Sequence, residues 1–294
     1  MKLTSPKRVK EILNKHDFKV KKSLGQNFIV DENVLNGIIN AAGLKYHDIV
    51  LEIGPGIGTL TKALAEFAEN VIAVEIDRDI IEILNSTLLK EYDNIILVQG
   101  DALKIEYDEL LALHLKEQKN VKVVANLPYY ITTPLLMKLA TSSKLAKDLV
   151  LTVQKEAAQR LMAKVGTKEY SAVTVILNYY YNIELVMKLT PNVFLPPPKV
   201  DSAVIKLEKH LESPVYLEDE ELFIEFVKKS FAKRRKTLKN NLKDLALITQ
   251  EDFSKILDEH DLDSMVRAQD LELFTFASIF NVFYNRYGAS FIKS

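Results

Sequence analysis

The sequence predicts an α/β protein, in which helices cover both faces of a parallel sheet and a small all-helical C-terminal domain follows. Three observations support this prediction. Short runs of β-branched residues alternate with helical periodicity over the first two thirds of the chain. A glycine-rich turn follows the first run, and only helical periodicity remains after Pro214. The 294 residues, 48% of them apolar, are enough for one large domain and a smaller one.

The chain opens with a polar and basic arm, residues 1–30, which has a helical pattern between Val9 and Leu13. We expect this arm to lie on the surface. Asp31 then supplies a side-chain cap for a helix whose apolar positions between residues 34 and 39 recur at helical spacing.

Five short strands follow, and helical segments separate them. They are Ile49–Ile53, Val71–Val74, Ile95–Val98, Val121–Ala125 and Leu149–Val153. Such apolar runs, with helices between them, are typical of parallel strands that are buried on both faces. Ligands of open α/β sheets bind where the carboxyl ends of these strands meet, so the residues after each strand are candidates for a site.

The pattern changes after a helix that begins near Gln154. Ile183–Leu189 and Ala203–Leu207 have strand character, and the rigid run Pro196–Pro198 interrupts the segment between them. We expect a hairpin that closes one edge of the sheet.

Glu212–Pro214 has the composition of a linker, and the segments after it have helical periodicity. We therefore divide the chain into an α/β domain, residues 1–210, and a helical domain, residues 211–294.

Composition excludes several kinds of chemistry. There is no Cys, so disulfides, thiolate metal sites and thiol nucleophiles are absent. The five His are scattered without a pair at ligand spacing, so we expect no metal. No apolar run approaches the roughly 18 residues of a membrane span, and the N-terminus lacks the apolar segment of a signal peptide. We expect a cytoplasmic protein that uses no membrane, and a monomer is the simplest state.

A basic segment stands out in a chain whose net charge is only −1. Residues 228–243 contain eight Lys or Arg and no acid. A solvated helix face is the ordinary explanation of a charge run. Eight uncompensated charges repel one another unless a polyanion neutralises them, which favours binding of phosphate groups.

Glycines fill the turn after the first strand, Gly54-Pro55-Gly56-Ile57-Gly58. Without a Cβ the backbone can approach a ligand closely, although a turn that is needed only for packing would look the same. The dinucleotide-binding pattern requires Gly or Ala at the next position, where this chain has Thr59. The spacing therefore disfavours NAD.

Two further strands end in acids. Glu75 ends the second strand, where its carboxylate can accept hydrogen bonds from both ribose hydroxyls. Asp101 follows the third strand and can accept from an adenine amino group, while the backbone of Ala102 reads the ring edge. Either acid alone could be a helix cap or a turn residue. Glycines and acids at three strand ends in succession predict a nucleoside site.

The tetrapeptide Asn126-Leu127-Pro128-Tyr129 follows the fourth strand. The Asn126 side-chain oxygen and the Leu127 carbonyl can accept the two hydrogens of an adenine N6 amine, so that its lone pair points at a methyl donor. Pro128 keeps the loop rigid and Tyr129 can stack on the base. Phe194 is a candidate for a second stacking ring, and core packing is the alternative for it. An exposed strand-ending turn is the ordinary explanation of such a tetrapeptide.

Several motifs occur together in the order seen in one family. They are Lys21 to Phe28, Glu52 to Gly58, Asn126 to Tyr129, Gln154 to Glu156 and Phe194 to Val204. In this combination the chain resembles the ribosomal RNA adenine N6-dimethyltransferases over nearly its whole length. The segment Ser230 to Leu238 resembles the branch that acts on the small subunit.

The resemblance implies a Rossmann-like S-adenosylmethionine-dependent methyltransferase fold with a small all-helical RNA-binding C-terminal domain. S-adenosyl-L-methionine would be the cofactor, held by Gln26, Asn27, Ile29, Gly54, Gly56, Glu75, Ile76, Asp101, Ala102 and Asn126. The RNA-binding residues would be Lys21, Lys22, Lys233, Arg234, Arg235, Lys236 and Lys239. The implied substrate is a pair of adjacent adenosines in the 3′-terminal hairpin of 16S rRNA, within a precursor of the small ribosomal subunit.

Four alternatives stay open at this point. An NAD-dependent enzyme is disfavoured by Thr59, and a DNA adenine methyltransferase would carry the same tetrapeptide. A related branch methylates one adenine of 23S rRNA and confers macrolide resistance. A ribosome-assembly factor that binds RNA would also use the basic segment.

Overall fold

The computed structural model describes residues 3–114, 121–245 and 247–292, with the exception of the Lys22 side chain. The chain divides into two compact units, one of residues 1–158 and 183–209, the other of residues 159–182 and 210–294. Residues 159–182, which the sequence-based division places in the first domain, group with the C-terminal helices because α8 (Ala172–Tyr180) packs against α9 (Glu220–Ser230) and α12 (Leu273–Tyr287).

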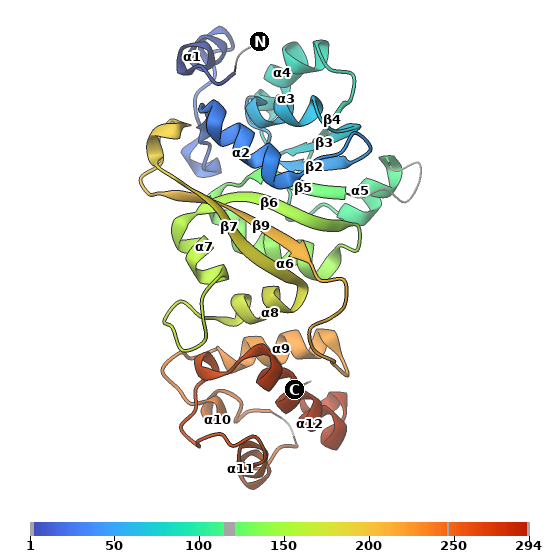
Figure 1. Cartoon of the computed structure of the whole chain (residues 1–294), viewed down its shortest axis with the longest axis vertical. Coiled ribbons are helices and arrows are strands. Elements are labelled where there is room, and N and C mark those ends of the chain that lie inside the picture. Colours follow the sequence, from blue (N-terminus) through green and yellow to red (C-terminus); the bar gives the residue numbers. More distant parts are fainter. Residues whose placement is uncertain (1–2, 115–120, 246, 293–294) are drawn as a thin grey trace. The chain divides into compact units, whose positions relative to one another are not determined.

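A seven-stranded sheet forms the centre of the first unit (Figure 1), with the strand order β4-β3-β2-β5-β6-β9-β7. Its strands are β2 (Ile49–Ile53), β3 (Asn70–Glu75), β4 (Ile95–Gln99), β5 (Val121–Asn126), β6 (Ala146–Gln154), β7 (Tyr181–Leu189) and β9 (Ser202–Lys209). The first five are parallel, and β9 runs antiparallel to β6. The five predicted parallel strands are confirmed, and β7 and β9 close one edge as expected.

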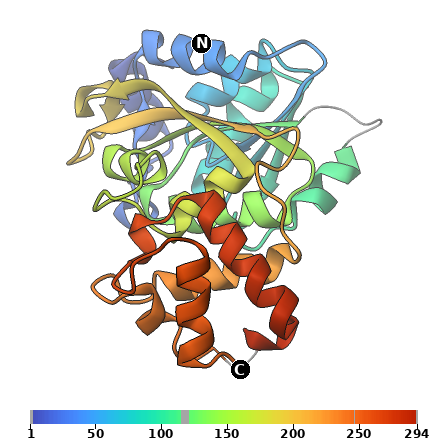
Figure 2. The ribbon, with the colours of Figure 1, turned by 60° about the horizontal axis from the view of Figure 1, so that its bottom comes forward.

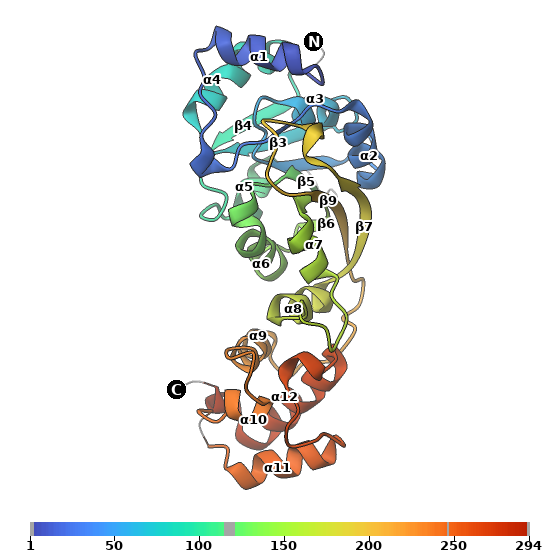
Figure 3. The same cartoon turned by 90° about the vertical axis from the view of Figure 1, so that its left-hand side faces the viewer.

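Helices cover both faces of this sheet. On one face lie α2 (Glu32–Ala42), α3 (Thr59–Ala65) and α4 (Arg78–Ser86), and on the other α5 (Tyr107–His114) and α6 (Thr132–Ser142) (Figures 1 and 3). The connections thus change face between β2 and β5, which is where an open α/β sheet leaves a crevice for a ligand. The predicted cap of α2 is confirmed, since the Asp31 carboxylate accepts from the backbone N–H groups of Asn33 and Val34.

The N-terminal arm packs against the first unit through a helix. Its helix α1 (Pro6–Lys15) buries Val9, Ile12 and Leu13, because these residues share one face of an amphipathic helix. The helix lies beside α4, and the His16 ring is hydrogen-bonded to Ser86 at 3.3 Å (Figure 3). One face of α1 thus holds the arm against the first unit, while most of its other residues are exposed.

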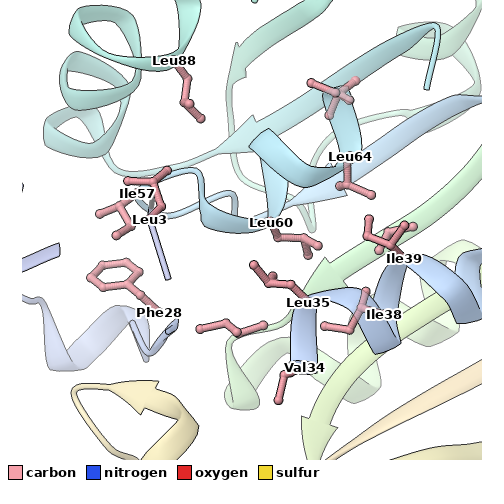
Figure 4. Packing of buried hydrophobic residues seen from close by; sticks show 14 of the residues in the cluster. Leu3, Phe28, Val34, Leu35, Ile38, Ile39, Ile57, Leu60, Leu64 and Leu88 are labelled. Carbon is pink, nitrogen blue, oxygen red and sulfur yellow. The ribbon is translucent and has the colours of Figure 1, made fainter. Parts of the chain in front are cut away.

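A hydrophobic cluster packs against the glycine turn. Leu60 and Leu64 of α3 face Leu35, Ile38 and Ile39 of α2, and Phe28 lies beside Ile57 of the turn (Figure 4). Phe28 belongs to a two-residue strand, β1 (Phe28–Ile29), which pairs antiparallel with β8 (Phe194–Leu195). Packing thus fixes both the turn and the segment that precedes α2.

The second unit is helical, as predicted. Its other helices include α10 (Leu238–Asn241) and α11 (Gln250–Glu259), and α7 (Lys155–Leu161) spans the boundary in the sequence (Figure 2). Aromatic rings dominate its core: Phe223, Phe226, Phe276, Phe280, Phe283 and Phe291 are fully buried. Within the described ranges no helix is long and apolar enough to cross a membrane.

Candidate active site

A pocket opens at the carboxyl edge of the sheet, where β2 and β5 lie side by side. Its walls come from the loops that follow β2, β3, β4 and β5, and from residues 24–29 before α2. Every predicted cofactor-binding residue and all four residues of the tetrapeptide lie in this wall. The fold thereby brings residues from positions 24 to 131 of the chain into one cavity.

The glycine turn owes its composition largely to packing. Gly54 and Gly56 have φ angles of +70° and +54°, which side chains rarely adopt. A Cβ on Gly56 would lie 2.8 Å from the Phe28 ring, so the position is closed by the hydrophobic cluster. A Cβ on Gly54 would lie 3.7 Å from the Pro128 ring, so the turn runs next to the tetrapeptide. These two glycines therefore shape the pocket and hold its two principal loops together.

Glu75 and Asp101 are oriented by the backbone around them. One oxygen of Glu75 accepts from the N–H groups of Ile76 at 2.8 Å and Asp77 at 2.9 Å. Asp101 accepts from the N–H of Leu103 at 3.0 Å. Each carboxylate has two oxygens and keeps capacity to accept further hydrogen bonds, as the predicted nucleoside site would require. Burial raises the pKa of Glu75, and backbone hydrogen bonds oppose this shift.

Sequence reasoning missed a third acid, Glu52. It lies inside β2, is almost fully buried, and its Oε2 atom has no hydrogen-bond partner among the described residues. Burial, which the nearby Thr61 hydroxyl opposes and to which the charge of Glu75 adds, raises the pKa of Glu52 to about 8. A buried oxygen without a partner is costly unless a ligand satisfies it. The signal was an acid in the middle of the apolar strand Ile49–Ile53.

The charge of the pocket is one-sided. Three acidic residues, Glu52, Glu75 and Asp101, lie in its wall, and none of the described lining residues is Lys, Arg or His. Acids without a cation favour a positively charged ligand over a phosphate. A pyrophosphate-bearing dinucleotide would meet repulsion here.

Asn126 is held so that one atom of its amide remains available. Its Nδ2 donates to the backbone carbonyl of Asn27 at 2.7 Å. A carbonyl can only accept, so this bond assigns the nitrogen and leaves the side-chain oxygen as an acceptor. The Leu127 N–H donates to the Thr152 carbonyl at 3.1 Å, which fixes the backbone at the next residue. The site therefore offers two acceptors, the Asn126 oxygen and the Leu127 carbonyl.

The orientation of the Tyr129 ring is fixed by a hydrogen bond to β9. Its hydroxyl is hydrogen-bonded to that of Ser202 at 2.7 Å, and Ser202 is fully buried at the start of β9. Tyr130, which sequence reasoning also missed, lines the same pocket with 57% of its surface exposed. Burial, with contributions from the charges of Asp101 and Glu75, raises its pKa.

Phe194 does not line the pocket. It is 3% exposed, pairs with Ile29 in the two-stranded sheet, and belongs to the hydrophobic cluster. This position agrees with core packing, the alternative that the sequence left open for Phe194, and not with a place in the pocket wall. The Gln26 side chain bonds to Asp77 although the residue lines the pocket.

The central part of the basic segment, residues 231–237, forms a turn between α9 and α10. Lys233, Arg234, Arg235 and Lys236 are exposed and have no ion-pair partner in the described part of the chain. Asn241 holds the turn by donating to the carbonyls of Ser230 and Lys233. The four charges are thus displayed by a fixed backbone.

The other predicted RNA-binding residues differ from this turn. Lys239 donates to Ser254 at 2.9 Å, and Lys21 forms ion pairs with Asp77 and Asp79. The Lys22 side chain lies outside the described residues. In the ranges that the structure describes, no three His, Asp or Glu are grouped as metal ligands.

The sheet order, the glycine turn and the acids at successive strand ends define the Rossmann-like fold of S-adenosylmethionine-dependent methyltransferases. A family model for ribosomal RNA adenine dimethylases matches residues 17–284. The chain belongs to the ribosomal RNA adenine dimethylase family. It is therefore an enzyme, a methyltransferase of the rRNA adenine dimethyltransferase type.

Individual relatives agree with this assignment. The chain is 44% identical over 276 residues to a ribosomal RNA small subunit methyltransferase A of Clostridium botulinum, covering 94% of this chain and 98% of the relative. It is 45% identical over 282 residues to the protein of that name in Geobacillus thermodenitrificans, covering 95% and 96%.

Solved structures agree with the fold. A dimethyladenosine transferase from Plasmodium falciparum has a TM-score of 0.72 and 29% identity, over 90% of this chain and 99% of the other. The 23S rRNA methyltransferase ErmE has a TM-score of 0.66 over 86% and 98%, and at 24% identity this likeness concerns the fold alone.

Proposed function

We propose that this enzyme transfers methyl groups from S-adenosylmethionine to two adjacent adenosines in the 3′-terminal hairpin of 16S rRNA. Each adenine N6 amine would be dimethylated while the RNA is part of a precursor small subunit. One observation carries the proposal: a pocket with three carboxylates and no cationic side chain among its described lining residues adjoins two acceptors that suit an amine. The names of the two bacterial relatives support the small subunit as the substrate.

The lining residues fit the cofactor. S-adenosylmethionine supplies an activated methyl group on a sulfonium and also carries an ammonium group. Glu52, whose buried Oε2 atom has no partner among the described residues, is suited to neutralise this positive charge. The Glu75 carboxylate would bind the ribose hydroxyls and Asp101 the adenine amino group. Asn27, the Ile29 backbone and Gly54 would hold the methionine part.

Two acceptors would hold the target amine. The Asn126 oxygen and the Leu127 carbonyl would accept its two N–H groups, which would draw the lone pair out of the ring and leave it free to attack the methyl group that the cofactor supplies. Tyr129 would stack against the base, and a stacked ring contributes roughly 1–3 kcal/mol toward the cost of displacing it. Alignment supplies the acceleration, so no general base is required.

The basic turn would contact the RNA backbone. Lys233, Arg234, Arg235 and Lys236 are exposed and unpaired among the described residues, and Asn241 fixes the chain that displays them. Arg and Lys in such a setting bind phosphates without regard to sequence. We assign the helical unit the role of orienting the subunit while the pocket performs the transfer.

The test is methylation of purified small subunits that lack this modification, with radiolabelled cofactor, followed by mapping of the modified adenines. The proposal expects two adjacent dimethyladenosines near the 3′ end of 16S rRNA. Large subunits, 23S rRNA and duplex DNA are assayed in parallel. Incorporation at a single 23S adenine, or in DNA alone, would replace the proposal by the corresponding alternative. Binding to subunits without any methyl transfer would indicate an assembly factor.

A further inference from the structure

Lys21 lies outside the pocket, but its side chain connects the pocket wall to the loop after β3. Its Nζ atom is 2.6 Å from Asp77 Oδ1 and 2.8 Å from Asp79 Oδ2. The Asp77 side chain is 0% exposed, so its carboxylate depends on partners from the protein. A lysine that is committed to two carboxylates is poorly placed to serve as a phosphate contact.

Gln26 completes a closed network with these groups. Its Nε2 donates to Asp77 Oδ2 at 2.8 Å, and its Oε1 accepts from the Lys21 backbone N–H at 2.8 Å. Asp77 in turn donates its own N–H to Glu75, the proposed ribose ligand, at 2.9 Å. The network therefore couples two walls of the pocket, residues 24–29 and the end of β3.

Residues 24–29, which we call the strap, are fastened at three places. The Asn27 carbonyl accepts from Asn126, and beyond it β1 pairs with β8. Among the side-chain hydrogen bonds of the described residues, those from Lys21 and Gln26 to Asp77 fasten the N-terminal end to the loop after β3. Removal of the Lys21 charge would leave Asp77 with one side-chain donor fewer and loosen this end of the strap.

We infer that Lys21 is a positioning residue for the cofactor, acting through Asp77 and Gln26 to hold the strap against the pocket. The inference rests on the proposed function, because the ligand that the strap retains is S-adenosylmethionine. It differs from the sequence-based assignment of Lys21 to RNA. Experiment can distinguish the two roles. Loss of a positioning residue weakens binding of the cofactor, whereas loss of an RNA contact weakens binding of the ribosomal subunit.

The test compares Lys21→Met, which keeps the aliphatic stem, with Lys21→Arg, which keeps the charge. Lys19→Met is the matched control, because Lys19 is exposed on the same arm and has no ion pair among the described residues. Calorimetric titration of the full chain with S-adenosylhomocysteine should give a Kd raised about tenfold in Lys21→Met, the size expected when a charge-assisted pair is removed. The control should stay within about threefold of the unmodified chain, and Lys21→Arg, which keeps the charge, should lose less affinity than Lys21→Met.

Steady-state kinetics on small subunits supply the second measurement. In Lys21→Met the KM for S-adenosylmethionine should rise while kcat and affinity for the subunit stay near their original values. An unchanged Kd for S-adenosylhomocysteine, or weaker binding of the subunit alone, overturns the inference. A Lys21→Met chain that is unfolded at assay temperature, by circular dichroism, also overturns it, because Lys21 would then be a structural residue. Failure of the unmodified chain to bind S-adenosylhomocysteine would instead refute the proposed function.

Discussion

The orientation of one amide decides the chemistry available at Asn126. Because Nδ2 donates to the Asn27 carbonyl, the side-chain oxygen is an acceptor and cannot exchange places with the nitrogen. Two acceptors suit an amine with two hydrogens. After the first methylation one hydrogen remains, so the second transfer can use only one of these acceptors at a time.

Replacing Asn126 with Ala should lower the rate of methyl transfer by about 100-fold or more, the size seen when a group that orients or polarises the reacting centre is removed. Binding of S-adenosylhomocysteine should change by less than about fivefold, because the other ligands of the cofactor remain. Single-turnover rates and calorimetry measure the two effects. Full activity in this variant would contradict the polarised-amine mechanism.

Glu52 should make the stability of the ligand-free protein depend on pH. Burial raises the pKa of its carboxyl from 4.5 to about 8. Between these values the folded chain holds a proton that the unfolded chain has released, so the free energy of unfolding falls as pH rises through the window. Glu52→Gln removes this contribution, which is at most about 1.4 kcal/mol per pH unit.

Urea unfolding at pH values from about 5 to about 8 measures this effect, and the stability of Glu52→Gln should rise relative to the original chain as pH increases. The variant should also bind S-adenosylmethionine more weakly, because it cannot carry the compensating negative charge. Parallel stability curves for the two proteins would show that Glu52 does not hold the extra proton.

At the scale of elements, an anchor on β9 orients the short helix that carries Tyr129 (Tyr129–Ile131). Ser202→Ala removes the hydrogen bond to the Tyr129 hydroxyl and leaves the ring free to turn. We expect the transfer rate to fall by about tenfold, corresponding to about 1.4 kcal/mol, and cofactor affinity to stay unchanged. Tyr129→Phe should behave alike, and the double variant should show little further decrease. Additive decreases in the double variant would contradict this coupling.

The turn between α9 and α10 should set the salt dependence of subunit binding. Replacing Arg234, Arg235 and Lys236 together with Ala should weaken binding and reduce the slope of log K against log salt by about 0.7–0.9 for each phosphate that is no longer neutralised. Lys255→Ala is the control, since the Lys255 charge is paired with Glu251 at 2.9 Å. Filter binding at several salt concentrations measures the slope, and an unchanged slope would remove the turn from the RNA interface.

At the scale of the whole molecule, cofactor binding should stabilise the fold. S-adenosylhomocysteine at about 100 times its Kd adds about 2.7 kcal/mol to the free energy of unfolding. This corresponds to a rise in Tm of several degrees for a chain of this size. NAD at equal concentration should give no shift, because its pyrophosphate would face acidic residues and no cation among the described lining residues. Thermal scans of the full chain separate these ligands, and a shift with NAD alone would favour the alternative of an NAD-dependent enzyme.

The strands, the class of fold and most of the pocket wall follow from local patterns in the sequence. β-Branched runs and helical periodicity are local patterns, and parallel strands necessarily bring their carboxyl ends to one edge. Gly54, Glu75, Asp101 and Asn126 could therefore be grouped without coordinates.

The other features emerge only when the chain is folded, because the burial and the partners of a side chain depend on residues far apart in the sequence. It assigned Phe194 to the core, paired Lys21 with Asp77, and left the buried Oε2 of Glu52 without a partner among the described residues. It also grouped residues 159–182 with the C-terminal helices. No local pattern reports whether a charge is exposed or a carboxylate is satisfied, since both depend on which distant side chains complete its surroundings.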